Sequence, residues 1–333
     1  MHVTVPIVEA SQTGESRRAA VRLAEQLGFD ETQRGRLAIV VTELARNLVQ
    51  HGRGGELLLR GLDRDDFLGV EVLALDKGPG MADFANSLSD GVSTRGTPGT
   101  GLGAVSRLSD VFDVYTQPGK GTAVLAHVFA RRPRVPNGSP QLQVGVVNVP
   151  FPGETVSGDA WDVHRSRLRD EAILADGLGH GELAADAARH AVRIFREQSG
   201  RAPAELIDDV HAALRATRGA AVAIAALDYE RREIQYAGVG NISGVVLSGD
   251  EHQSMVSHNG TLGHLLTRCH QFAYRWPRGA TVVMNSDGIA TWQLTPYPGL
   301  LARHPSLLAG VLYRDFKRGR DDATIVALRE SAL

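Results

Sequence analysis

The sequence predicts an α+β protein of two domains, each built from sheets covered by helices. Its 333 residues suffice for two domains of ordinary size, and 43% of them are hydrophobic, enough for two cores. Strand-like apolar runs and helical patterns follow one another without regular βαβ alternation, which argues against a parallel wound sheet. Residues 131–141 are rich in Pro, Gly and Arg, as is typical of a linker. We therefore expect domains at residues 1–130 and 142–333.

Charge and composition exclude several classes of protein. The formal charge is −2 at pH 7, so a surface that binds nucleic acid is not expected. Cys269 is the only cysteine, which excludes an internal disulfide and fits a reducing cytoplasm. No apolar run approaches the roughly 20 residues that span a bilayer, and the first residues lack a signal pattern. We expect a cytoplasmic protein without a membrane partner.

In the first half, two helices are expected before a set of strands. Apolar spacing predicts helices at residues 13–27 and 31–50, and Asp30 with Gln33 has the form of a capping box that starts the second one. Apolar runs and turn residues predict strands at residues 55–62, 68–75, 111–116 and 122–129.

Polar residues and glycines occur at three places in this half. Glu43 and Asn47 lie four residues apart and therefore share one face of the second helix. Asp76 ends a strand and begins the run Asp-Lys-Gly-Pro-Gly. Residues 96–103 form a glycine loop before a probable helix, and such a loop can present backbone N–H groups to phosphate. A Glu and an Asn at this spacing usually mark a solvated helix flank, so only the order of all three motifs favours a nucleotide site.

This order of motifs resembles the GHKL (Bergerat) nucleotide-binding fold. Through the run Thr42-Glu43-Leu44-Ala45-Arg46-Asn47, residues 10–130 are most similar to bacterial serine kinases of the anti-sigma-factor and stressosome-switch type. The resemblance implies that Asn47 holds Mg²⁺ on the phosphates of ATP, that Glu43 is the catalytic base, and that Asp76 binds the adenine amino group. It also implies six further nucleotide-binding residues: Gly78, Gly80, Gly99, Gly101, Gly103 and Thr122. A histidine kinase is rejected, because only His2 precedes the first helix.

In the second half, strands repeatedly meet aspartates at their ends. Asp176 and Asp287 each follow an apolar run and precede a glycine, and Asp159 lies at another strand edge. Asp321 and Asp322 come directly before the expected strand at residues 323–328. Carboxylates from such distant positions would repel one another, so their convergence requires a cation. An all-oxygen ligand set favours Mg²⁺ or Mn²⁺ over zinc.

These motifs, from about residue 142 onward, resemble the metal-dependent (PPM-type) protein serine/threonine phosphatases, in the branch of the bacterial sporulation and stress-response phosphatases. The resemblance implies an α-β-β-α sandwich in which Asp176 bridges two metals with help from the Gly177 carbonyl. It further implies that Asp287 and Asp321 complete the pair and that Asp159 acts through bound water. Asp322 stands where relatives carry Asn, so we expect it to support the metal ligands rather than to bind the metal itself.

Two residues near these motifs have alternative roles. His180 could protonate a leaving group, but a role in shaping the loop is favoured. Asn241 ends the run Gly238-Val239-Gly240-Asn241, which resembles a motif near the substrate in this branch of phosphatases. A turn between strands needs no such role.

Together the halves predict a bifunctional switch of bacterial stress and sigma-factor signalling. The first domain would phosphorylate Ser or Thr on a partner with ATP and Mg²⁺, and the second would remove phosphate with two Mn²⁺ or Mg²⁺ ions. The resemblance implies STAS-domain proteins of the anti-sigma pathway as partners, and a homodimer is allowed. The alternative is a phosphatase gated by a nucleotide domain that captures a partner without transferring phosphate. Retention of Glu43 favours the kinase, because a binding module needs no base.

Overall fold

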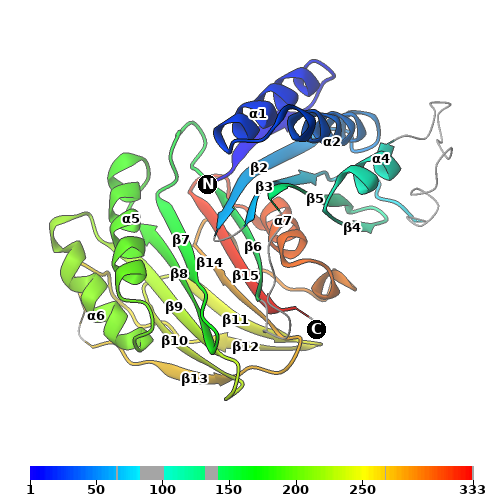
Figure 1. Ribbon diagram of the computed structural model, residues 1–333. Helices are drawn as coiled ribbons and strands as arrows, with labels where there is room; N and C mark the ends of the chain where they lie inside the picture. The colour runs from blue at the N-terminus through cyan, green and yellow to red at the C-terminus, as the bar shows by residue number, and fades with distance from the viewer. Residues whose placement is uncertain (65–66, 83–100, 132–141, 267, 332–333) are drawn as a thin grey trace. The chain divides into compact units, whose positions relative to one another are not determined.

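A computed structural model describes the chain except for residues 65–66, 83–100, 132–141, 267 and 332–333. The chain separates into two compact units (Figure 1). The N-terminal unit comprises His2–Pro136 together with Tyr297–Arg314. The C-terminal unit comprises Asn137–Pro296 and Asp315–Leu333, together with Met1. A segment from the second half of the sequence therefore belongs to the N-terminal unit.

The N-terminal unit is built on one antiparallel sheet of five strands in the order β1-β2-β3-β5-β4. The strands are β1 (Val3–Ile7), β2 (Gly55–Arg64), β3 (Phe67–Leu75), β4 (Val111–Gln117) and β5 (Gly121–Arg131). Four of them are the strands that the sequence predicts. The prediction missed β1, a short edge strand containing Pro6, because its structure depends on pairing with the distant β2.

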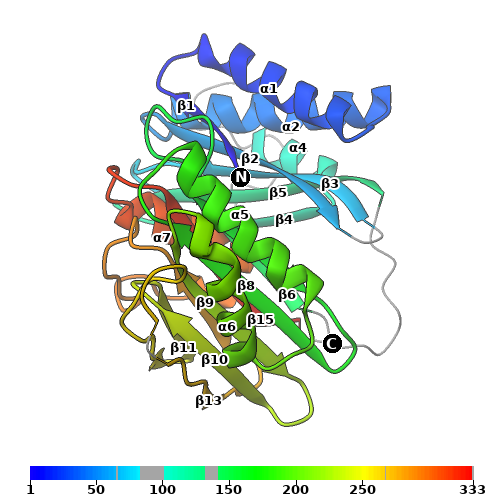
Figure 2. The ribbon, with the colours of Figure 1, turned by 90° about the vertical axis from the view of Figure 1, so that its left-hand side faces the viewer.

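Helices α1 (Gln12–Gln26) and α2 (Glu31–Gln50) lie on one face of this sheet (Figure 2). The predicted capping box at the start of α2 is confirmed: the Gln33 N–H donates to Asp30 Oδ1 at 2.8 Å, and the Asp30 N–H donates to Gln33 Oε1 at 3.0 Å. A shorter helix, α4 (Gly101–Leu108), begins within the predicted glycine loop and includes its Gly101 and Gly103. The core between helices and sheet includes Leu37, Val41, Leu44, Leu57, Leu59, Val70, Val72 and Val124.

The other face of the sheet carries α7 (Pro305–Phe316). Side chains alternate along a strand, so Leu73 and Leu75 point away from the face on which Val72 and Ala74 pack with α1 and α2. A Cβ atom added at Gly310 would lie 3.1 Å from Leu75 Cδ2, which places α7 directly on that second face. Residues 305–314 of α7 are all buried, so the helix lacks the amphipathic stripe by which it could have been predicted.

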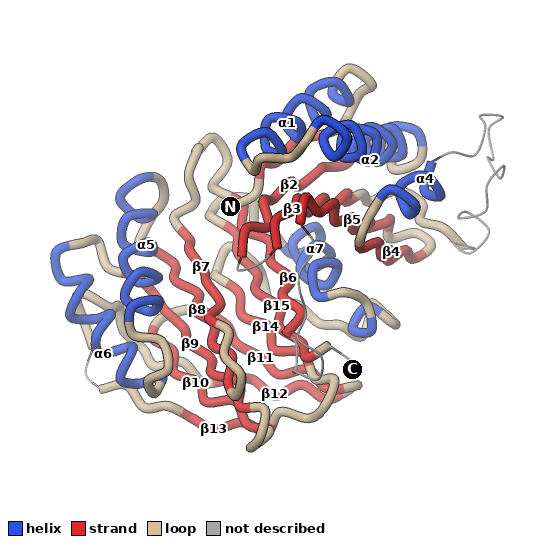
Figure 3. The backbone as a smooth tube through the Cα atoms, viewed as in Figure 1, coloured by secondary structure: helices blue, strands red, loops and turns tan. Residues whose placement is uncertain are grey.

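The C-terminal unit contains two five-stranded antiparallel sheets that face each other (Figure 3). The first has the order β13-β10-β9-β8-β7, and the second has the order β12-β11-β14-β15-β6. Leu174 and Tyr236 of the first sheet pack with Val282 and Val326 of the second. The ten strands are β6 (Leu142–Val149), β7 (Asp159–His164), β8 (Arg169–Gly177), β9 (Ala220–Asp228), β10 (Glu233–Val239), β11 (Ser243–Ser248), β12 (Glu251–Met255), β13 (Phe272–Arg275), β14 (Thr281–Asn285) and β15 (Ala323–Glu330).

Helices α5 (Glu182–Glu197) and α6 (Pro203–Ala213) cover the outer face of the first sheet. Phe195 of α5 and Ile207 of α6 pack in one cluster with Ile224 of β9. The predicted α+β class, with sheets covered by helices, is confirmed in both units. Among the residues that the structure describes, no helix is both long and apolar enough to cross a membrane.

Candidate metal centre and nucleotide site

Two of the predicted metal-binding aspartates lie side by side in the first sheet of the C-terminal unit. Asp159 is the first residue of β7 and pairs directly with Asp176 in β8. Directly opposed residues of antiparallel strands have Cβ atoms about 4.5–5.5 Å apart and project from the same face of the sheet. The pairing register therefore brings these two carboxylates together.

The second sheet brings three more aspartates to the same place. Asp287 follows the end of β14, and Asp321 and Asp322 immediately precede β15, the strand with which β14 pairs. The Ser286 N–H donates to the Thr324 carbonyl at 3.0 Å, and Ser286 Oγ donates to Asp159 Oδ2 at 2.7 Å. Because Asp159 belongs to the first sheet, the Ser286 hydroxyl joins the sheets where their aspartates lie.

The closeness of these carboxylates shifts their pKa values. Burial raises the pKa of Asp176 well above its usual range, and the charges of the other four aspartates raise it further. Burial likewise raises the pKa of Asp159, and the charges of Asp322 and Asp321 add to the rise. The pKa of Asp287 is raised by burial and then by the charge of Asp321. Each carboxylate is therefore destabilised as an anion until a positive charge neutralises the group.

The donor set of this cluster fits oxygen-ligated divalent cations. Asp159 Oδ1 and Asp322 Oδ2 are buried and accept no hydrogen bond from any residue that the structure describes, so these oxygens lack the donors that usually satisfy such groups. As the side chains stand, no three Asp, Glu, His or Cys residues of the described chain form a ready-made metal site. Binding a cation therefore requires the carboxylates to turn inward, which their mutual repulsion otherwise opposes.

Asn241 belongs to this cluster, although the sequence supports no more than a turn there. Its Nδ2 donates to Asp287 Oδ2 at 2.7 Å, so it holds the carboxylate of a predicted ligand. The motif that contains Asn241 was the available signal. His180 instead bonds to Glu154 Oε1 at 2.8 Å, and its ring stacks on Phe151 with 4.4 Å between centroids. These contacts fit the role in shaping the loop.

In the N-terminal unit, Asp76 follows β3 and is held rigidly beside β5. The residue is 9% exposed, and its Oδ1 accepts the Gly78 N–H at 2.8 Å and the Thr122 N–H at 3.1 Å. The Asp76 N–H donates in turn to the Thr122 carbonyl at 2.9 Å. Burial raises the pKa of Asp76, although its two backbone donors oppose the rise. Asp76, Gly78 and Thr122, which the sequence predicts to line one site, are thus in contact.

Two of the predicted glycines have no room for a side chain. A Cβ atom at Gly78 would lie 2.9 Å from the Gly52 Cα. Gly80 has a φ of +68°, and its Cβ would lie 2.1 Å from the Gln117 carbonyl oxygen. The chain can follow this path beyond Asp76 only with glycine at both positions.

The predicted phosphate side of the site is formed by α2 and α4. Gly101 begins α4, and its Cβ would lie 3.5 Å from Asn47 Oδ1; Gly103 is buried within α4. No described residue accepts a hydrogen bond from the buried Asn47 Nδ2, so this N–H group can still donate to a phosphate oxygen. Glu43, one turn earlier, accepts a bond from Arg46 Nη1 at 3.0 Å. Gly99 lies outside the described residues.

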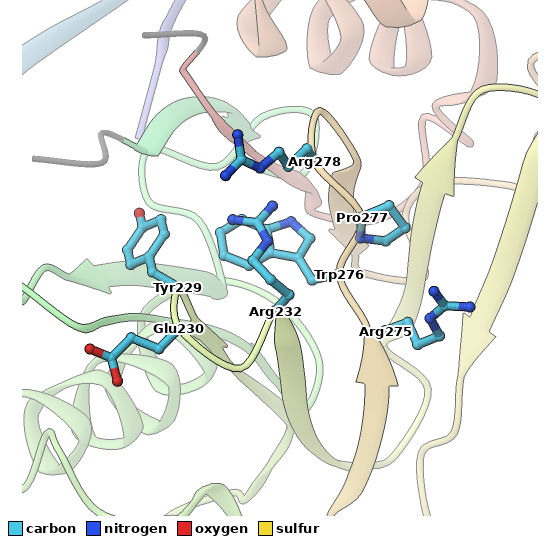
Figure 4. Close-up of a pocket in the computed structure, with 7 residues that line it drawn as sticks. All are labelled: Tyr229, Glu230, Arg232, Arg275, Trp276, Pro277 and Arg278. Carbon is cyan, nitrogen blue, oxygen red and sulfur yellow. The ribbon is translucent and has the colours of Figure 1, made fainter.

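A cavity of about 300 Å³ lies elsewhere in the C-terminal unit (Figure 4). The Arg232 guanidinium lies over the Trp276 ring, 4.5 Å from its centroid. The cavity adjoins the turn after β9, whereas Asp176 pairs with Ala221 at the start of β9, so cavity and carboxylates lie at opposite ends of the sheet. Its lining residues are Tyr229, Glu230, Arg232, Arg275, Trp276, Pro277 and Arg278, none of which is a predicted site residue.

Family models match both parts of the chain, as a kinase-like ATPase domain followed by a phosphatase domain. Residues 8–127 match the histidine kinase-like ATPase domain, and residues 169–330 match stage II sporulation protein E. Serine/threonine-protein kinase RsbT of Bacillus subtilis (strain 168) is 33% identical over 125 residues, which are 38% of this chain and 90% of that protein. The chain therefore belongs to the RsbT family of ATPase domains and also carries a phosphatase domain of the sporulation protein E (PP2C) type. Both resemblances expected from the motifs are confirmed.

Other relatives match the C-terminal part. Phosphoserine phosphatase RsbX of Bacillus subtilis (strain 168) is 22% identical over 149 residues, which are 44% of this chain and 75% of that protein. A crystal structure of RsbX with magnesium has a TM-score of 0.51 at 19% identity and covers 60% of this chain and 99% of that one. The phosphatase domain of SpoIIE from Bacillus subtilis, with a regulatory fragment, has a TM-score of 0.50 at 16% identity and covers 97% and 94% of the two chains. At these identities the solved structures establish the fold.

Proposed function

We propose that this protein is a bifunctional switch that phosphorylates a partner protein on Ser or Thr and also removes that phosphate. The observation that carries the phosphatase half is the meeting of Asp159, Asp176, Asp287 and Asp321 at the ends of two facing sheets. Local sequence preferences cannot explain why like charges from four separate segments are gathered in one place. Recruitment of divalent cations explains it.

In the phosphatase half, Asp176, Asp287 and Asp321 would hold two Mn²⁺ or Mg²⁺ ions, with the Gly177 carbonyl assisting and Asp159 acting through water. When bound, such a pair of cations supplies an activated water and neutralises the phosphoryl oxygens. Ser286 and Asn241 would orient the carboxylates of Asp159 and Asp287 by the hydrogen bonds described above. No side chain needs to attack the phosphate. Magnesium in the RsbX structure agrees with this choice of metal.

In the kinase half, Asp76 would accept a hydrogen bond from the adenine amino group, and Asn47 would hold Mg²⁺ on the phosphates. Glu43 would take the proton of the attacking hydroxyl. The relation to RsbT supports this assignment. A solved structure from the bacterial stressosome is also similar to this chain, with a TM-score of 0.52 at 28% identity. We propose that the partners are STAS-domain proteins of such a pathway, encountered in the cytoplasm.

One observation favours a second candidate, a phosphatase gated by nucleotide without phosphoryl transfer. The Glu43 carboxylate, which would have to be free to act as a base, is paired with Arg46 on the same helix. In this candidate, Asn47 and the glycines would bind ATP, and a partner would be captured without modification.

Transfer of labelled γ-phosphate separates the two candidates. The experiment uses Asp176→Asn, so that label placed on a STAS-domain partner is not removed again. The switch predicts that label accumulates on Ser or Thr of the partner and disappears when wild-type protein and Mn²⁺ are added. Tight ATP binding with an unlabelled partner would contradict the switch and support the gate. Label that persists after wild-type protein and Mn²⁺ are added would contradict removal of this phosphate by the second domain, and with it the switch.

A further inference from the structure

The chain passes through the N-terminal unit on its way between two proposed metal ligands. Asp287 and Asp321 belong to the C-terminal unit, whereas Tyr297–Arg314, which lies between them in the sequence, belongs to the N-terminal unit. The chain therefore leaves the proposed metal centre, forms α7 on the sheet that carries Asp76, and then returns to the metal centre. A movement of α7 acts on the backbone that leads to Asp321.

Buried contacts attach the start of α7 to this sheet. Ser306 Oγ donates to Glu71 Oε2 at 2.6 Å, and both side chains are fully buried. Glu71 also accepts bonds from Arg60 at 2.7 and 3.0 Å and bonds to His127 Nε2 at 2.9 Å. Removing one member of such a buried network leaves the others unsatisfied, so the network resists separation of α7 from the sheet.

Further contacts fix the residues before α7. Asp113 of β4 accepts the His304 N–H at 2.8 Å and a bond from Arg303 Nη1 at 3.3 Å. Lys120, in the turn that precedes Thr122, lies 4.5 Å from the centroid of the Tyr297 ring. The segment is thereby attached to the two strands that flank the proposed nucleotide site.

At the other end of α7, Arg314 reaches Asp76 itself. Its Nη1 donates to the Asp76 carbonyl at 2.9 Å, and the Arg314 side chain is buried. A Cβ atom at Gly121 would lie only 2.1 Å from the same carbonyl oxygen, so little free space surrounds it. The bond goes to the main chain of the residue whose carboxylate is proposed to bind adenine. A shift of Asp76 on nucleotide binding therefore changes the Arg314 contact directly.

We infer that Tyr297–Arg314 couples the two sites, with Arg314 as the positioning residue that links Asp76 to the backbone before Asp321. This inference rests on the proposed function and adds a regulatory path to it. A bound nucleotide that restricts the motion of Asp76 also restricts Arg314 and the chain that follows it. The metal ligands then lose less conformational entropy when they bind a cation, so the affinity for the cation rises. By linkage, a metal ion at Asp321 strengthens nucleotide binding by the same factor.

The test measures the free Mn²⁺ concentration that gives half-maximal hydrolysis of p-nitrophenyl phosphate, with and without ADP, in a buffer that fixes free Mn²⁺. Wild-type protein is expected to need at least about fivefold less Mn²⁺ when ADP is bound. The Asp76→Asn variant should show no shift, which controls for chelation of metal by ADP. The shift is a ratio within each variant, so a change in basal activity cancels.

Two variants test the path. Arg314→Met should abolish the ADP-dependent shift, and Ser306→Ala, which loosens α7 without touching Asp76, should reduce it. Arg303→Met is the matched control, because Asp113 keeps its bond from the His304 backbone, and the shift should persist. Hydrogen–deuterium exchange of α7 should slow with ADP in wild-type protein but not in Arg314→Met.

Three results would overturn the inference. The first is wild-type protein that binds ADP and hydrolyses the substrate with an unchanged Mn²⁺ requirement, and the second is a higher requirement with ADP. The third is a full shift in Arg314→Met. Absence of ADP binding, or of Mn²⁺-dependent hydrolysis, would overturn the corresponding half of the proposed function as well, so the two failures are distinguishable.

Discussion

Asp176→Asn is expected to lower Mn²⁺-dependent hydrolysis of a phosphoserine peptide by about a thousandfold or more. Asp176 lies at the centre of the carboxylate cluster, where the other four aspartates all raise its pKa. The proposed site needs it to bridge both cations, and an amide cannot supply the second anionic oxygen. Initial rates measured across a range of Mn²⁺ concentrations would show whether added metal restores activity.

Asp170→Asn is the matched control for this variant. Asp170 is a buried aspartate on the same strand, but it bonds to Tyr229 and Ser166 at the end of β8 away from the cluster. The Asp170→Asn variant should retain metal-dependent hydrolysis even if the substitution lowers the stability of the fold. Metal-free Asp176→Asn should unfold at a temperature no lower than wild type, because the amide removes the free energy that burial of this carboxyl among four other aspartates costs. Full activity in Asp176→Asn would refute its assignment as the bridging ligand.

Glu43→Gln is expected to slow phosphoryl transfer to the partner by about 10²–10⁴-fold while ATP still binds. The substitution keeps the size of the side chain and removes only its ability to accept a proton. Asn47, which would hold Mg²⁺ on the phosphates, and Asp76, which would bind adenine, are unchanged. Single-turnover transfer of labelled phosphate and a separate ATP-binding titration measure the two effects independently.

Glu31→Gln, on an exposed position of the same helix, should leave both transfer and ATP binding close to wild type. Unaltered transfer in Glu43→Gln would show that Glu43 is not the base. Loss of ATP binding together with transfer would instead indicate that the Glu43–Arg46 pair supports the site rather than the chemistry.

The sequence predicts most of the elements whose signals are local. Helix α2 has the predicted bounds, because its capping box and its apolar stripe are both written in adjacent residues. The missed elements depend on distant partners. Strand β12 is mostly exposed and polar and exists through pairing with β11, and α7 is buried all round. Residues Glu251–Met255 thus form a strand without an apolar pattern.

The candidate sites were predictable to the extent that they occupy the ends of elements. A strand that ends on Asp-Gly, or a glycine loop before a helix, identifies Asp176 or Gly101 without knowledge of the fold. Ser286 and Arg314 carry no such signal, and the motif that contains Asn241 is equally well explained by a turn. Each is identified by a hydrogen bond to a residue far away in the sequence. Ser286 bonds to Asp159, Asn241 bonds to Asp287, and Arg314 bonds to Asp76. Only the packing of the strands and helices reveals those partners.

The anomalous scattering of manganese in a crystal of the protein soaked with Mn²⁺ tests the central claim most directly. The proposed centre predicts two peaks about 3.5–4 Å apart, within bonding distance of Asp176 and of the carboxylates of Asp287 and Asp321. A map with no peak beside Asp176, in crystals that bind Mn²⁺ elsewhere, would contradict it.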